Sequence, residues 1–230
     1  MPPSPHLLHV TSRPLVVTPA LWKQWYKTEH LRDLVHGGVA TRATFYEEVG
    51  GPETPDTRKF LALYQTDHAE PLNTPAFASL RSTSELFAKE GGTPSIAENG
   101  DFDARVYNLI QEFDPKGTGE TPAPFIVTVE MNPANIDDFE KWYREEHLDM
   151  LAKMPGYRRS LRYRLGPATP MTKGESQPGY LAIHEVDGLE DAFGSQEGKA
   201  ASETEWSVRQ TGESKPFFAR MWKAVHAEGF

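Results

Sequence analysis

The chain has 230 residues, a formal net charge of −9 at pH 7, 38% hydrophobic residues, 11% aromatic residues and no cysteine. The acidic balance argues against nucleic acid or an anionic membrane as a partner, and the lack of cysteine excludes disulfides, thiol nucleophiles and cysteine-ligated zinc. No apolar run approaches the roughly 20 residues of a membrane span, and the N-terminus has no secretory-signal pattern. We therefore expect a globular, cytoplasmic protein with no membrane association.

The first half of the chain is predicted to begin with a strand over residues 7–11. A helix over residues 22–34 follows, then a Gly- and Pro-rich loop over residues 50–57. Residues 60–67 are expected to form the next strand. The boundary with the second half is predicted at residues 114–124, which are rich in Pro, Gly and Thr and show no apolar periodicity.

The second half is predicted to begin with a buried strand over residues 125–129. A helix with one apolar face follows, capped by Asn135 or Asp137 and ended by Pro155-Gly156. Alternating side chains predict a strand over residues 157–165. After a Gly- and Pro-rich loop, further elements are expected as a strand over 180–186, a helix over 189–207 and a strand over 215–224.

The two halves share a sequence pattern. Trp142-Tyr143-Arg144-Glu145-Glu146-His147-Leu148 matches Trp25-Tyr26-Lys27-Thr28-Glu29-His30-Leu31 at a shift of 142 − 25 = 117 residues. Val127-Thr128 lies opposite Val10-Thr11 at the same shift, and residues 180–187 match residues 60–67 at a shift of 120. The preserved order predicts an internal duplication.

Each copy has the element order β-α-β-β-α-β of a ferredoxin-like unit, which leaves one sheet face bare. We therefore predict an α+β fold in which two tandem ferredoxin-like units pack sheet to sheet as an intramolecular dimeric α+β barrel. The predicted domains are residues 1–113 for the first repeat, 114–124 for the linker and 125–230 for the second repeat. Because the fusion covers both bare faces, either a monomer or a dimer of two-repeat chains is expected.

A family resemblance follows from one helix and the turn after it. Phe139, Trp142, Tyr143, Glu146, His147 and Leu148, followed by Met154-Pro155-Gly156-Tyr157, resemble the dimeric α+β barrel superfamily and most closely its EthD-like branch. The first copy keeps Trp25, Tyr26, Glu29, His30 and Leu31 but has Val35-His36-Gly37-Gly38 where Met-Pro-Gly is expected. The superfamily includes decarboxylases, polyketide cyclases, lactone isomerases, cofactor-free monooxygenases and haem enzymes, so the resemblance does not choose a reaction.

Three histidines are the candidate catalytic residues: His147, His30 and His184. His147 lies four residues after Tyr143, so we expect it on the apolar face of its helix, and His30 has the same relation to Tyr26. Such a histidine is either a core residue or a general acid or base. The resemblance favours the second role, because this helix histidine often borders the ligand cavity in similar proteins.

The candidate substrate-binding residues surround those histidines and are Tyr143, Tyr26, Trp142, Arg159, Tyr64 and Tyr180. Tyr64 and His184 occupy matching strand positions, so the two copies are expected to differ chemically. Arg159 is predicted to point with Tyr157 and Leu161, either as a solvated residue or as a group that holds a substrate carboxylate or phenolate. No HxH, HExxH or clustered carboxylate motif occurs, so no metal and no cofactor are expected.

These patterns predict a cofactor-free enzyme of small-molecule, secondary metabolism. A histidine would carry general acid–base chemistry on an aromatic or polyketide-like substrate, in a decarboxylation or a cyclisation. One alternative is a cofactor-free monooxygenase of the same fold. Another is a non-catalytic protein that binds small molecules in the same cavity, and a third is a protein whose surface loops contact other proteins.

Overall fold

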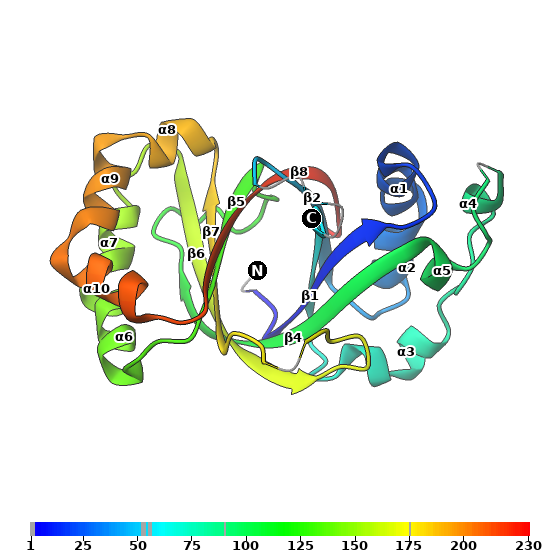
Figure 1. Ribbon diagram of the computed structural model, residues 1–230, viewed down its shortest axis with the longest axis horizontal. Coiled ribbons are helices and arrows are strands. Elements are labelled where there is room, and N and C mark those ends of the chain that lie inside the picture. Colours follow the sequence, from blue (N-terminus) through cyan, green and yellow to red (C-terminus); the bar gives the residue numbers. More distant parts are fainter. Residues whose placement is uncertain (1–2, 52–53, 55–56, 90, 175) are drawn as a thin grey trace. The chain divides into compact units, whose positions relative to one another are not determined.

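The structure is a computed structural model that describes residues 3–51, 54, 57–89, 91–174 and 176–230 (Figure 1). The first half contains β1 (His6–Pro14), α1 (Pro19–Trp25), η1 (Tyr26–His30), α2 (Leu31–His36), β2 (Arg42–Glu48), β3 (Phe60–Thr66), η2 (Pro71–Asn73), α3 (Pro75–Ala78), α4 (Glu85–Lys89), α5 (Ile96–Asn99) and β4 (Gly100–Phe113). The second half contains β5 (Phe125–Met131), α6 (Ile136–Trp142), η3 (Tyr143–His147), α7 (Leu148–Leu151), β6 (Tyr157–Ala168), β7 (Tyr180–Val186), α8 (Leu189–Phe193), α9 (Gln196–Glu203), α10 (Glu205–Glu213) and β8 (Phe217–Glu228).

The strands in the described residues follow the closed, antiparallel order β1-β3-β2-β8-β5-β7-β6-β4. The predicted α+β class and barrel are therefore confirmed. The chain divides into two compact units. The N-terminal unit comprises Pro3–Asn108, Gly166–Glu175 and Ala224–Phe230, and the C-terminal unit includes Leu109–Leu165 and Ser176–Lys223. A segment from the second half of the sequence, Gly166–Glu175, thus belongs to the N-terminal unit.

The first helix of each unit begins at a side-chain cap. Thr18 accepts from the N–H of Leu21 before α1, and Asn135 accepts from the N–H of Asp138 before α6. The sequence had left Asn135 and Asp137 as possible caps, and the structure shows that Asn135 is the cap. After α7, Gly156 has φ 66, a left-handed conformation that favours glycine and turns the chain into β6.

A π-helical turn follows each of these helices and ends at a histidine: η1 follows α1 and ends at His30, and η3 follows α6 and ends at His147. The N–H of Leu31 bonds to the carbonyl of Tyr26, and the N–H of Leu148 bonds to that of Tyr143. This wider turn stacks each histidine on the tryptophan five residues earlier, with ring centroids 4.3 Å apart in the N-terminal unit and 4.1 Å apart in the C-terminal unit. The expectation of regular α-helical spacing was therefore wrong at this turn.

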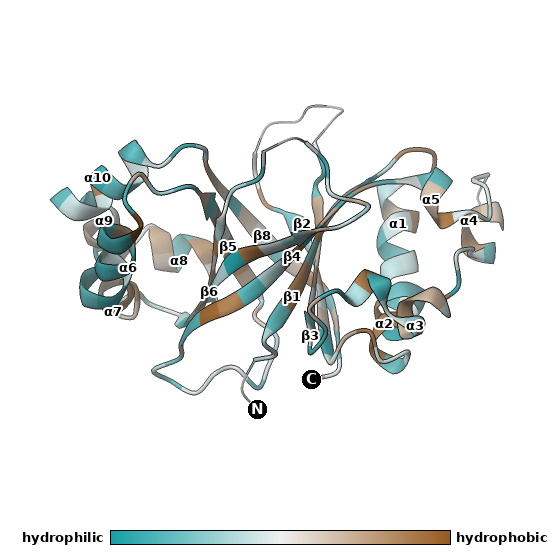
Figure 2. Cartoon of the chain, turned by 90° about the horizontal axis from the view of Figure 1, so that it is seen from below, coloured by the Kyte–Doolittle hydropathy of each residue, from teal (hydrophilic) through white to brown (hydrophobic). Residues whose placement is uncertain are grey.

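In the N-terminal unit, β3 lies between β1 and β2, and β4 pairs with the other edge of β1. The sheet face toward α1 and α2 is apolar, and its side chains form one core with those helices. In the C-terminal unit, β5 pairs with β7 and β8, and β6 pairs with β7. In Figure 2 the outward sides of α7 and α10 are mainly hydrophilic.

The strand register corrects one match between the halves. Val10 pairs with Ala62, and Val129 pairs with Ala182. Since Ala62 and Ala182 correspond at a shift of 120, Val10 corresponds to Val129, a shift of 129 − 10 = 119. The match of Val10 to Val127 at a shift of 117 was wrong by two residues, because the helices and the first strands are joined by turns of different length.

Several predicted bounds also differ from the structure. The helix predicted over residues 189–207 is three short helices, α8, α9 and α10, which extend to Glu213. The last strand runs from Phe217 to Glu228 rather than from 215 to 224. Part of the loop predicted over residues 50–57 lies outside the described residues. No helix in the described part of the chain has the length and apolar character to cross a membrane.

Candidate functional site

A cavity of about 360 Å³ lies inside the N-terminal unit. Its walls come from the helix-facing side of the sheet, from α2 and from the segment between β3 and β4, and most of them are apolar. The polar groups along it are those of His30, Tyr64, Asp33, Arg81 and Ser82. A mostly apolar cavity of this size with a few polar groups is typical of small-molecule sites, which span roughly 300–1,000 Å³.

His30 presents an unpaired imidazole to this cavity. The ring stacks on Trp25 and meets Tyr26 edge to face, with centroids 5.2 Å apart. Within the described residues no side chain or carbonyl hydrogen-bonds its nitrogens. Burial lowers the pKa of His30 to about 3, so the imidazole is neutral at physiological pH. A neutral imidazole with a free nitrogen can accept a proton from a bound molecule.

Tyr64 brings a second polar group to the same place. Its ring meets that of His30 edge to face at 6.2 Å, and its buried hydroxyl has no hydrogen-bond partner among the described residues. Burial raises the pKa of Tyr64 well above its ordinary value, and the nearby Tyr26 adds to this. The hydroxyl therefore stays protonated as a donor. An unpaired buried polar group costs roughly 1–3 kcal/mol, which a bound acceptor would recover.

The charged end of the cavity is internally paired. Arg81 Nε lies 2.7 Å from the carboxylate of Asp33, and Arg81 Nη1 lies 3.5 Å from that of Glu29. The Arg81 side chain is 46% exposed, whereas those of Asp33 and Glu29 are 17% and 20% exposed. These contacts fasten the segment after α3 to the helix that carries His30.

The matching region of the C-terminal unit is packed with polar side chains. His184 Nδ1 lies 2.7 Å from Ser160 Oγ, which lies 2.8 Å from the hydroxyl of Tyr157. His147 stacks on Trp142 and bonds to the carbonyl of Ala201, and its Nδ1 has no partner in the described chain. Burial lowers the pKa of His147 to about 3 and that of His184 to about 4.

One substitution between the units changes the sheet surface under the helix. Phe45 pairs with Ala62 and stacks on Tyr26 at 3.8 Å with an interplanar angle of 8°. At the matching place, Arg162 pairs with Ala182 and lies over the ring of Tyr143, also at 3.8 Å. The Arg162 guanidinium is paired with Glu140 at 2.9 Å and with Gln111 at 2.6 Å. A buried cation and its partners thus take the place of an aromatic stack.

The structure sorts the predicted site residues into two groups. His30 and Tyr64 line the cavity, and Tyr26 lies directly behind them. Trp142, Tyr143, His147 and His184 contact one another in the C-terminal unit, where Tyr180 packs on Phe139 at 5.2 Å. None of this second group lines the cavity beside His30.

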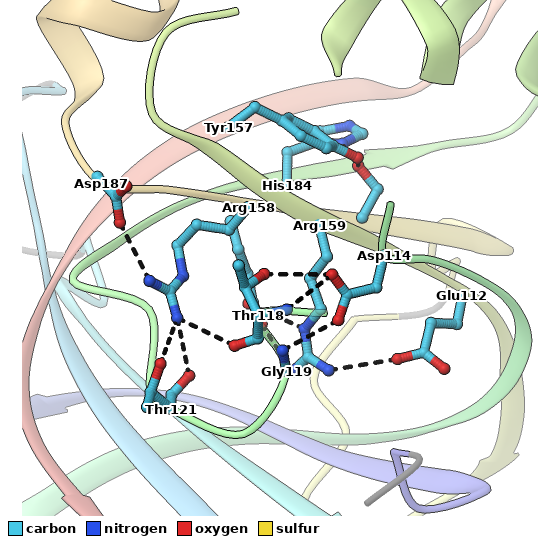
Figure 3. Close-up of polar contacts among 12 residues, drawn as sticks. Glu112, Asp114, Thr118, Gly119, Thr121, Tyr157, Arg158, Arg159, His184 and Asp187 are labelled. Carbon is cyan, nitrogen blue, oxygen red and sulfur yellow. Dashed lines mark hydrogen bonds and ion pairs between the residues drawn. The ribbon is translucent and has the colours of Figure 1, made fainter. Parts of the chain in front are cut away.

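Arg159 shares a face of β6 with Leu161, as predicted, but not with Tyr157, so that part of the expectation was wrong. A bulge between Tyr157 and Arg159 breaks the alternation of β6 and sends Arg159 to the side opposite His184 (Figure 3). There its guanidinium binds Glu185 at 2.9 and 3.0 Å and Glu112 at 3.4 Å. Neighbouring Arg158 binds Asp187 and the loop carbonyls of Thr118 and Thr121.

Sequence reasoning missed the residues that enclose the cavity. These come from the irregular segment between β3 and β4 and from Met171, which is remote in sequence from His30. Neither the segment between β3 and β4 nor the loop around Met171 has a periodic pattern, so only their apolar content could have indicated that they line a cavity. Among the described residues no group of three or more His, Asp or Glu side chains is placed to hold a metal ion.

No known family model matches the chain. It is 28% identical over 198 residues to core atranone cluster (CAC) protein 1 of Stachybotrys chlorohalonatus (strain IBT 40285), covering 80% of this chain and 82% of that protein. A provisionally assigned monooxygenase of Fusobacterium nucleatum subsp. nucleatum ATCC 25586 has a similar structure, with TM-score 0.54, 10% identity and coverage of 98% and 94% of the two chains. An anthrone oxidase-like protein has TM-score 0.52, 14% identity and coverage of 98% and 93%. These structures support the predicted resemblance to dimeric α+β barrels at the level of the fold.

Proposed function

We propose that this protein is a cofactor-free enzyme of small-molecule, secondary metabolism and that its active site is the cavity beside His30. The observation that carries the proposal is that His30 and Tyr64 line one apolar cavity and that the buried hydroxyl of Tyr64 has no hydrogen-bond partner among the described residues. The substrate class is an aromatic or polyketide-like molecule. The similarity to a protein of the core atranone cluster supports this metabolic setting.

The proposed chemistry is proton abstraction. Neutral His30 takes a proton from a phenol or from a carbon next to a carbonyl, and the electron pair moves onto the carbonyl oxygen. Tyr64 donates a hydrogen bond to that oxygen. Because burial lowers the pKa of His30 to about 3, an acidic substrate is needed, and the oxyanion formed beside it would raise that pKa. His30, rather than His147 or His184, is therefore the proposed catalytic residue.

A cyclisation fits these groups better than a decarboxylation. The enolate carbon would attack a second carbonyl of the same substrate, forming a carbon–carbon bond, and the protonated His30 would return its proton to the new alkoxide. A decarboxylation needs a cation to orient the leaving carboxylate. The cation that lines the cavity, Arg81, already pairs with Asp33 and Glu29.

The second candidate is a cofactor-free monooxygenase, which the descriptions of the two structural neighbours favour. The same proton abstraction would give an electron-rich anion that meets O₂. One oxygen atom would become a ketone oxygen at a substrate CH₂ group, and the other would leave as water with the two hydrogens of that group. Stoichiometric O₂ consumption separates this reaction from a cyclisation.

The test is turnover of a panel of hydroxylated aromatics and polyketide-like ketones, with product analysis and an oxygen electrode. Tyr64→Phe removes one hydroxyl and should lower kcat by about 10²–10³-fold, the scale of losing one oxyanion donor. Tyr163→Phe, a buried tyrosine of β6 outside the cavity, is the control. A non-catalytic binding protein would bind members of the panel without turnover, and Tyr64→Phe would then change affinity alone.

We also infer that the two halves are tandem ferredoxin-like copies of one unit, with boundaries at residues 1–113, 114–124 and 125–230. The shared strand register and the paired π-turns support this inference. The EthD-like branch, the monomeric or dimeric state and the cytoplasmic location stay predictions.

A further inference from the structure

The cavity beside His30 shares a wall with a second hollow of the same unit. The second hollow has a volume of about 500 Å³ and is more polar. Ala97, Phe102 and Met171 line both of them. These three residues therefore lie between the cavity and the outer hollow.

The backbone on either side of Met171 is fastened to β4. The hydroxyls of Thr169 and Thr172 both donate to the carbonyl of Ala104, at 2.7 and 2.9 Å, and the N–H of Ala104 donates to the carbonyl of Met171 at 3.2 Å. Lys173 adds a bond from its N–H to the carboxylate of Asp103 at 3.0 Å. The backbone position of Met171 is thus set, and its side chain is the part that can vary.

The other two wall residues are less free to change. Ala97 has no rotatable side chain, and Phe102 packs on Trp22 in the core with centroids 5.4 Å apart. Met171 is half-buried, and a methionine side chain has three rotatable bonds and an adaptable thioether. All but Ala97 of the three pack against the core, and Met171 is the one whose side chain is unbranched and can change its conformation.

We propose that Met171 sets the length of the molecule that the cavity accepts, a proposal that rests on the proposed function. The ligand class is a hydroxylated aromatic compound that carries an apolar side chain. Its hydroxyl lies beside His30 and Tyr64, and its side chain extends toward Met171. A side chain longer than the cavity displaces the thioether and emerges in the outer hollow.

The experiment measures Kd by isothermal titration calorimetry for a series of 4-alkylphenols, from methyl to nonyl. In the wild type, affinity should rise with chain length and then stop rising at a cut-off length. Met171→Ala should move the cut-off to longer chains and tighten binding of the longest phenols by about tenfold, because two or more further CH₂ groups become buried. Met171→Phe should move the cut-off to shorter chains, and Met171→Leu, similar in volume, should leave it in place.

Met221→Ala is the matched control, because Met221 is 44% exposed and lies on β8 outside the cavity. An unchanged cut-off in both Met171→Ala and Met171→Phe overturns this inference while leaving the proposed site intact. The same shift in Met221→Ala also overturns it. A wild type that binds none of the phenols overturns the proposed site and this inference together.

Discussion

The two helix–sheet layers of this protein place the same helix motif over different sheet surfaces. In the N-terminal unit, Tyr26 rests on Phe45, and His30 and Tyr64 line a cavity where the Tyr64 hydroxyl has no partner within the described part of the chain. In the C-terminal unit, Arg162 lies under the helix instead, and His184 is bonded to Ser160.

This difference shows that a helix motif does not by itself identify an active site. The histidine has the same stacking partner and the same lowered pKa in both units. What differs is the layer above it. Trp142 of α6 donates to Ser207 on α10, and Ser207 donates to the carbonyl of Ala201 on α9, which holds α9 and α10 against α6. The segment that faces His30 leaves a cavity in the same place.

The largest expected effect is on turnover. His30→Ala should lower kcat by about 10²–10⁴-fold, because it removes the group proposed to transfer the proton. His147→Ala should change kcat by less than about threefold, since it removes only a packed side chain, although it should cost about 1–3 kcal/mol of stability. The measurement is steady-state turnover, with circular dichroism to show that both variants are folded. Equal losses in the two variants would contradict the assignment of the site to the N-terminal unit.

The second effect is acid destabilisation. The folded-state pKa values of His30, His147 and His184 are about 3, 3 and 4, below the ordinary value of about 6.5 in an unfolded chain. Between those values the unfolded chain binds more protons, so stability is highest above pH 6.5 and falls as pH falls toward 4. Three histidines together give a slope of up to about 4 kcal/mol per pH unit.

Urea unfolding at pH 4.5, 5.5 and 6.5 measures this slope. His184→Gln keeps a hydrogen-bonding side chain and removes one titrating group, so it should flatten the slope by up to about 1.4 kcal/mol per pH unit. An undiminished slope in this variant would show that carboxylates, rather than the buried histidines, cause the acid sensitivity.

The fold could be predicted from the sequence because its signals are local. The period-two strands, the Asn135 cap and the repeated Trp-Tyr-x-x-Glu-His-Leu pattern each report on a few neighbouring residues. The choice between His30 and His147 could not be predicted, since both stand in the same pattern. It depends on long-range packing by segments without periodicity, including Met171, which lies about 140 residues away from His30.

The third expected effect is the loss of stability when Phe45 or Arg162, the two matching residues under the helices, is replaced by alanine. Arg162→Ala removes a buried cation from Glu140 and from the ring of Tyr143, and should cost about 2–4 kcal/mol. Phe45→Ala should cost about 3–5 kcal/mol, because it opens a space under Tyr26. Glu140→Gln separates them, since it removes the carboxylate that pairs with Arg162 and should change the cost of Arg162→Ala while leaving that of Phe45→Ala unaltered. Urea unfolding of the single and double variants measures both, and additive costs for Glu140→Gln and Arg162→Ala would contradict the ionic role of Arg162.

The smallest expected effect is a change in stability on removing one hydroxyl, and it should have opposite signs in the two units. Tyr64→Phe removes a buried hydroxyl that has no partner among the residues that the structure describes, so the free energy of unfolding should rise by up to about 1 kcal/mol, even as turnover falls. Ser160→Ala leaves Tyr157 and His184 without their shared partner and should cost about 1–3 kcal/mol. Thermal unfolding of both variants measures the signs. A loss of stability in Tyr64→Phe would mean that its hydroxyl already has a hydrogen-bond partner without added ligand. A gain would mean that the N-terminal unit keeps a destabilising group, which selection retains most readily where that group serves a ligand.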